Sequence, residues 1–83
     1  MTLRKHVDIK VRGKDMFGAS FRENAQVIAV ADSELCVSMW RPMAENFPLE
    51  VQFYDNESFW MWGQIMEVRQ QLDGTQTVKV KLH

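Results

Sequence analysis

The segment HVDIKVR, residues 6–12, indicates the fold class of this chain. Its apolar residues Val7, Ile9 and Val11 alternate with polar ones, the period-two pattern of a strand that buries one face. Five further segments alternate in the same way or are rich in β-branched and aromatic residues. They are SFRENAQVIAVA (20–31), LCVSMWR (35–41), LEVQFYD (49–55), SFWMWGQIMEV (58–68) and QTVKVKLH (76–83). Six strands at roughly ten-residue spacing predict an all-β barrel or sandwich.

Turn residues separate these segments. Gly13 and Gly18 bracket the first connection, and the two prolines of PMAENFP at 42–48 predict a loop. Asp73 followed by Gly74 is a strong hairpin signal between the last two strands. No segment carries a helical pattern, so the antiparallel strands account for the whole fold.

Composition bounds the class of protein. The chain has 83 residues, 46 % of them hydrophobic, which predicts one domain spanning residues 1–83. It has no apolar run of about 18 residues and no signal-peptide pattern, so we expect a cytoplasmic protein that does not insert into a membrane. The single Cys36 excludes an internal disulfide and agrees with a reducing compartment.

Charge is unevenly distributed along the chain. The net charge is −1, but residues 1–22 carry +4, residues 23–57 carry −6 and residues 58–83 carry +1. If the two terminal strands pair, their outward basic residues form a ladder on the sheet. Its members are Lys10, Arg12, Lys79 and Lys81. Such a ladder either binds an anion or protects exposed strand edges from pairing with another chain.

Residues that could support catalysis or bind a metal do not converge in the sequence. His6 and His83 lie in the terminal strands, without the placed carboxylate or cysteine that a metal site needs. The glycines are scattered rather than gathered in a phosphate-binding loop, and the carboxylates fall in turns or at outward strand positions. We therefore expect a non-enzymatic protein without a metal or cofactor.

Segment 58–68 is apolar on both of its faces. One face presents Phe59, Met61 and Ile65, and the other presents Trp60, Trp62, Met66 and Val68. The first face can fill the core, so the tryptophan side needs a cover. A bulge near Gly63 would turn one tryptophan inward, and the loop at 42–48 could fold over the other. Otherwise the tryptophans form a contact surface for a protein partner or a second copy of the chain.

Exposed aromatic rings in a small barrel also suggest single-stranded nucleic acid, whose bases stack on such rings. However, segment 58–68 contains no lysine or arginine before Arg69, and acidic residues precede it at Glu50, Asp55 and Glu57. A phosphate backbone would be repelled there, and the chain has no overall basic excess. Nucleic-acid binding is therefore the third interpretation.

A family resemblance covers the whole chain. Its most specific part is the hairpin GKDMFGASFRE, with Gly13, Asp15, Gly18, Phe21 and Glu23, followed by LCVSMWRPM and GQIMEV. In these features the chain resembles a divergent PilZ-like domain. The resemblance implies a six-stranded antiparallel β-barrel and a role in bacterial signalling, since many PilZ domains are receptors for cyclic di-GMP. Many also carry a C-terminal helix beside the barrel, whereas this chain stops at His83, so we expect a barrel without that helix.

The two motifs that bind cyclic di-GMP in the family are not matched here. The arginine pair Arg-x-x-x-Arg has no counterpart, since Asp8 stands four residues after Arg4. The motif Asp/Asn-x-Ser-x-x-Gly falls on Ala29, Ala31 and Glu34. Because each charge-assisted contact contributes roughly 1.5–3 kcal/mol, tight cyclic di-GMP binding is expected to be lost.

The sequence thus predicts a non-enzymatic PilZ-like regulatory or protein-interaction module. The predicted contact surface comprises Trp40, Trp60, Trp62 and Met66. The alternative is a nucleotide receptor with a non-standard basic site, formed by Arg4, Lys5, Lys10 and Arg12.

Overall fold

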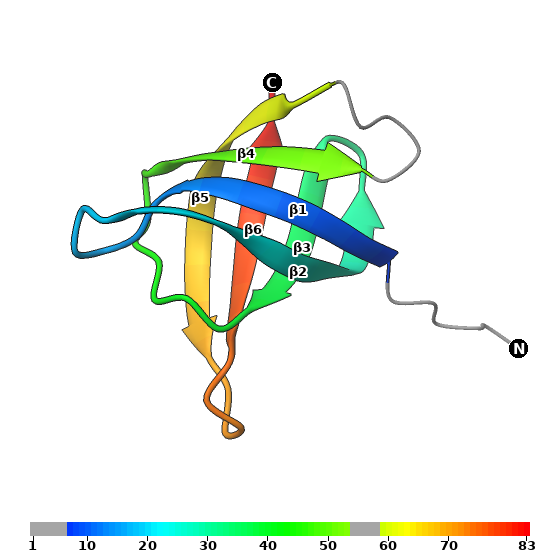
Figure 1. Cartoon of the computed structure of the whole chain (residues 1–83). Helices are drawn as coiled ribbons and strands as arrows, with labels where there is room; N and C mark the ends of the chain where they lie inside the picture. The colour runs from blue at the N-terminus through cyan, green and yellow to red at the C-terminus, as the bar shows by residue number, and fades with distance from the viewer. Residues whose placement is uncertain (1–6, 54–58) are drawn as a thin grey trace, which may run out of the picture.

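The computed structural model describes residues 7–53 and 59–83, in which six strands form a closed antiparallel barrel (Figure 1). The strands are β1 (Val7–Lys14), β2 (Ser20–Ala31), β3 (Glu34–Met39), β4 (Pro48–Phe53), β5 (Met61–Gln70) and β6 (Gln76–Leu82). The predicted all-β, six-stranded barrel is confirmed. Within these two ranges, no helix has the length and hydropathy needed to cross a membrane.

The strand order around the barrel is β1-β2-β3-β6-β5-β4, and β4 pairs back onto β1. Strand β1 therefore lies between β2 and β4, and β6 lies between β3 and β5. The expected basic ladder is wrong, because Lys10 and Arg12 lie on a different part of the barrel wall from Lys79 and Lys81. Because β1 pairs with β2 and β4, and β6 pairs with β3 and β5, the two terminal strands are not neighbours in the barrel.

The core consists of the inward side chains of all six strands. Its fully buried members are Ile9, Val11, Val37, Leu49, Val51, Ile65, Val78 and Val80. Burial of each such side chain stabilises the fold by about 1.5–3 kcal/mol relative to its exposure. Together with Phe21, Met39 and Met43, these aliphatic residues form most of the buried core, which contains no tryptophan among the described residues.

Trp62 in β5 and Trp60 just before this strand both lie on the outer side of the barrel. Gly63 is the inward residue next to Trp62, where an added Cβ would lie 2.7 Å from Val80 Cγ1. The irregularity in β5 occurs between Ile65 and Glu67, not at Gly63, so the predicted bulge that would turn one tryptophan inward is wrong. A larger residue at this inward position would clash with Val80. Gly63 therefore suits the inward position, and the neighbouring Trp62 points outward.

The loop between β3 and β4 closes one end of the barrel (Figure 1). Met43 is buried in the core, and its N–H donates to Gln76 Oε1 at 2.8 Å. Backbone hydrogen bonds also join Asn46 and Phe47 to Ile65 in the middle of β5. The loop therefore covers the core. The prediction that this loop folds over one of the tryptophans of segment 58–68 is wrong.

The hairpin motif that carries the PilZ resemblance takes part in a hydrogen-bonded network of Asp15, Glu23 and Arg41, which we call the clasp. Asp15 Oδ1 accepts the N–H groups of Phe17 at 2.9 Å and Ala19 at 3.1 Å, and Gly18 takes φ +80° in the same turn. Arg41, beyond β3, donates to Asp15 Oδ2 at 3.3 Å and to Glu23 Oε2 at 3.1 Å. The turn is thereby tied to the start of the closing loop.

The clasp also sets the charge state of its members. Burial raises the pKa of Asp15, but the hydrogen bonds from Ala19, Phe17 and Arg41 together hold it below its ordinary value. The hydrogen bond to Glu23 is the largest cause that raises the pKa of Arg41. Both groups are thus held in their charged forms inside a shared network.

Candidate functional site

Trp60, just before β5, is held by two arginines from neighbouring strands. The Arg12 Cζ lies 4.0 Å from the centroid of the Trp60 ring, and the Arg22 Cζ lies 5.5 Å from it. The register explains the contact, because Arg12 on β1 stands opposite Arg22 on β2 and opposite Glu50 on β4. Guanidinium groups at these distances attract the ring electrostatically. Two cations thus partly cover the Trp60 ring.

Glu50 balances one of these cations. Its Oε2 accepts a hydrogen bond from Arg12 Nη2 at 3.0 Å, and both side chains remain partly exposed. The pair fixes the Arg12 guanidinium over Trp60. Arg22 forms no ion pair within residues 7–53 and 59–83.

Trp62 lies beside this cluster and is half exposed. It stands opposite Glu50 on β4, and its ring packs against His83 with centroids 4.5 Å apart and planes tilted by 36°. The His83 N–H also donates to the Trp62 carbonyl oxygen at 3.0 Å. We call the outer surface formed by Arg12, Arg22, Glu50, Trp60, Trp62 and His83 the tryptophan face.

The other two residues of the predicted contact surface lie elsewhere. Met66 is 45 % exposed at the irregularity in β5, four residues beyond Trp62 and about 13 Å along the strand. Trp40, which follows β3, is 70 % exposed. It lies beside Gly74, a residue of the turn between β5 and β6. That turn is the opposite end of the hairpin from Trp62 (Figure 1). The four predicted residues therefore do not form one continuous patch.

The residues of the predicted nucleotide site are only partly described. Lys10 and Arg12 share the outer face of β1, whereas Arg4 and Lys5 lie outside the described residues. The positions that align with the second cyclic di-GMP motif lie along the β2–β3 hairpin. They are Ala29, Ala31 and Glu34, and the two alanines offer no polar side chain to a ligand.

The part of the chain that the structure describes contains no assembled site for metal binding or for a catalytic nucleophile. No group of three or more His, Cys, Asp or Glu side chains there could hold a metal ion. Cys36 is partly buried on the outer side of β3, opposite Ala29 and Lys79.

The sequence predicts Arg12 as a residue of the alternative nucleotide site, but it does not reveal that Arg12 and Arg22 cover Trp60. Segment 58–68 itself contains no lysine or arginine, and the two arginines reach Trp60 from other strands. Their outward positions are visible in the alternation of each strand. The contact itself depends on the pairing of β1 with β4, which joins segments far apart in the chain.

Comparisons with known proteins give no match, either to a family model, to a curated protein or to a solved structure. The function is therefore argued from the tryptophan face itself.

Proposed function

We propose that this chain is a non-enzymatic, PilZ-like regulatory barrel that contacts a protein partner through the tryptophan face. One observation carries the proposal: two tryptophans lie on the outer side of a barrel whose interior is already filled by other apolar residues. The closed six-stranded barrel and the hairpin of Gly13, Asp15, Gly18, Phe21 and Glu23 support the PilZ-like assignment.

The residue types of the tryptophan face support a protein contact. Tryptophan and arginine are enriched among the residues that dominate binding energy at protein interfaces. Here Arg12 fixes Trp60, and His83 packs against Trp62, before any partner arrives. Side chains that are ordered in advance lose less conformational entropy on binding, which favours affinity.

The partner is expected to place acidic groups near Arg22 and an apolar side chain against Trp62. Arg22 carries an unbalanced charge among the described ion pairs, and Trp62 is half exposed. Opposite charges at an interface mainly increase the association rate and the specificity. Association is therefore expected to weaken as the salt concentration rises.

The test compares Trp62→Ala with Trp40→Ala, a matched loss of an exposed indole away from the face. Light scattering over a concentration series measures self-association, and immobilised full-length chain measures the retention of other proteins from a lysate of the source cell. We expect Trp62→Ala to weaken association at least tenfold, about 1.4 kcal/mol, with little change in melting temperature. Trp40→Ala should leave association unchanged. A large loss of melting temperature for Trp62→Ala with unchanged association would contradict the proposal.

A nucleotide receptor is the second candidate, favoured by Lys10 and Arg12 on one outer face of β1. The engagement of Arg12 by Glu50 and Trp60 weighs against it, because a phosphate would have to displace Glu50. Amide shifts of the labelled protein on addition of cyclic di-GMP would test this candidate. Saturable shifts that weaken with salt and disappear in Arg4→Ala would place it first.

Single-stranded nucleic acid is the third candidate. The contacts of Arg12 and Arg22 with Trp60 supply the basic residues that segment 58–68 lacks. Against this, the two guanidinium groups occupy the ring on which a base would stack, and Glu50 interrupts the positive track. Tryptophan fluorescence during titration with oligonucleotides tests it, since binding would quench the signal with a steep salt dependence.

A further inference from the structure

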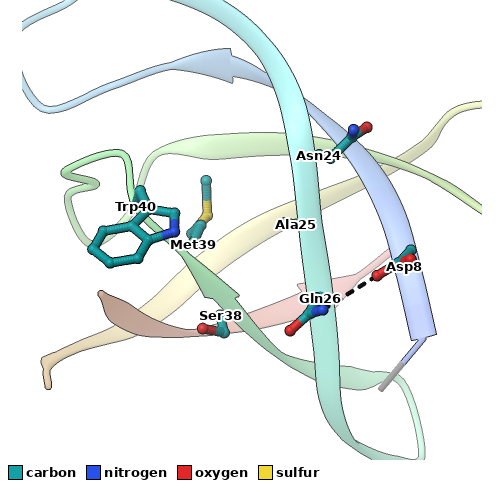
Figure 2. Close-up of a pocket in the computed structure, with 7 residues that line it drawn as sticks. All are labelled: Asp8, Asn24, Ala25, Gln26, Ser38, Met39 and Trp40. Atoms are coloured by element: carbon teal, nitrogen blue, oxygen red, sulfur yellow. Dashed lines mark hydrogen bonds between the residues drawn. The ribbon is translucent and has the colours of Figure 1, made fainter. Parts of the chain in front are cut away.

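A second surface of the barrel combines an open aromatic ring with uncharged polar groups. A groove of about 320 Å³ crosses the outer side of β2, with Asp8 of β1 on one side and Ser38 and Trp40 on the other (Figure 2). Ala25 and Met39 also line it. This volume lies at the lower end of the range for small-molecule sites, about 300–1,000 Å³.

Strand register builds the polar part of the groove. Gln26 stands opposite Asp8 on β1 and opposite Ser38 on β3, so three polar side chains form a row across the sheet. Asn24, two residues before Gln26, lies on the same side of β2 (Figure 2). The row follows from regular pairing and does not depend on a loop conformation.

Trp40 supplies the aromatic wall. Its ring is 70 % exposed and is bounded at one edge by Gly74, where an added Cβ would lie 3.3 Å from Cζ3. Trp60 and Trp62 have a guanidinium or an imidazole against their rings, whereas no described ring or cation packs on Trp40. One apolar ring is therefore open to a ligand beside several hydrogen-bonding groups.

Most of these polar groups are also open. Gln26 Nε2 donates to Asp8 Oδ1 at 3.4 Å, but the Asn24 amide and the Ser38 hydroxyl make no side-chain hydrogen bond within the described ranges. Amides and hydroxyls both donate and accept, and a carboxylate accepts. Sugar hydroxyl groups have the same double capacity, and the C–H side of a sugar ring is apolar enough to lie on an indole.

We propose that this groove binds a neutral carbohydrate, with Trp40 as the platform and Asn24, Gln26, Ser38 and Asp8 as the hydrogen-bonding groups. The site is independent of the proposed protein contact, because Trp40 and Trp62 lie at opposite ends of the β5–β6 hairpin. Among the described residues that line the groove, Asp8 is the one charged residue, and its negative charge disfavours phosphates and acidic sugars.

The experiment is an amide and indole shift titration of the isotope-labelled full chain with neutral oligosaccharides. The probes are cellotetraose, maltotetraose and mannotetraose, with choline as the cationic comparison. We expect saturable shifts of the Trp40 indole N–H and of the amides of residues 24–26 and 38–40 with at least one saccharide. Trp40→Ala should abolish these shifts, and Asn24→Ala should weaken the affinity at least fivefold.

Met66→Ala removes an exposed apolar side chain outside both proposed sites, so it is the control and should bind the saccharide as the parent chain does. Because Trp40 and Asn24 are exposed, we expect Trp40→Ala and Asn24→Ala to keep the melting temperature of the parent chain. Unchanged melting temperatures would show that both variants fold. Absence of shifts with all three saccharides would overturn the proposal. Shifts confined to the Trp62 indole, or binding of choline without any saccharide, would overturn it as well.

Discussion

Two arginines in this barrel make the same kinds of contact in different surroundings. Arg41 pairs with two carboxylates and lies 5.1 Å from the centroid of the Phe21 ring. Arg12 pairs with Glu50 and lies 4.0 Å from the centroid of the Trp60 ring. Each thus combines a salt bridge with a cation–π contact.

The difference between them is the burial of the partner groups. Asp15, beneath Arg41, exposes 5 % of its side chain, whereas Glu50 exposes 38 %. Phe21 is likewise buried, while Trp60 remains partly open. The same chemistry therefore stabilises the fold at Arg41 and shapes a binding surface at Arg12.

The largest effect is expected for Arg41→Ala. Removing this guanidinium leaves the buried Asp15 carboxylate without its cation and frees Glu23. The β1–β2 turn then loses its side-chain link to the closing loop and keeps only the backbone hydrogen bond from the Met16 N–H to the Pro42 carbonyl oxygen among the described contacts. We expect a fall of several degrees in melting temperature by calorimetry. Arg69→Ala is the matched control, because among the described ion pairs Arg69 contacts only Glu67, whose side chain is 38 % exposed. Equal effects of the two variants would show that the clasp does not stabilise the fold.

Gly63→Ala is expected to follow. The added Cβ would meet Val80 Cγ1 at 2.7 Å and the Lys81 carbonyl oxygen at 3.0 Å. Overpacking of this kind costs about 1–3 kcal/mol, measurable by urea unfolding. An unchanged unfolding midpoint would mean that Gly63 does not face inward, and the outward position of Trp62 would then lose its basis.

Acid stability tests the charge of the clasp. The pKa of Asp15 in the folded chain lies below its ordinary value of 3.8. The carboxylate therefore stabilises the fold above that pH, and this contribution is lost as the pH falls through the lower folded value. We expect Asp15→Asn to have a lower melting temperature than the parent chain at neutral pH. As the pH is lowered into the acid range, the melting temperature of the variant should fall less than that of the parent chain. Parallel curves of melting temperature against pH for the two proteins would contradict this.

Arg12→Ala is expected to have the smallest effect on stability. An exposed salt bridge contributes about 0–1 kcal/mol and an exposed cation–π contact about 0.5–1 kcal/mol, so the free energy of unfolding measured in urea should fall by about 0.5–2 kcal/mol. Association should weaken more than stability, because Trp60 loses the group that fixes it. A loss of stability as large as that of Arg41→Ala would erase the contrast between the two arginines.

The strands could be predicted from the sequence because their signal is local. Alternation in segments such as 6–12 and 76–83 marks each strand, and Asp73-Gly74 marks a turn. Each of the six predicted segments overlaps an observed strand. The inward position of Ile9 and Val11 follows from the same alternation.

The site could be predicted only in part because its contacts are not local. Trp60 and Trp62 were identified as a surface, but neighbouring residues in sequence could not reveal the arginines that cover Trp60. The closing pair β1–β4 brings them together, and no turn signal specifies that pair. Trp40 was grouped with the other tryptophans for the same reason, although it lies at the far end of the hairpin.

The most direct test of the central claim is the association of Trp62→Ala beside Trp40→Ala, with melting temperatures measured on the same samples. The account predicts that Trp62→Ala loses association while both variants unfold close to the parent chain. Equal association of the two variants, or a cooperative loss of folding in Trp62→Ala, would contradict the assignment of the tryptophan face as the contact surface.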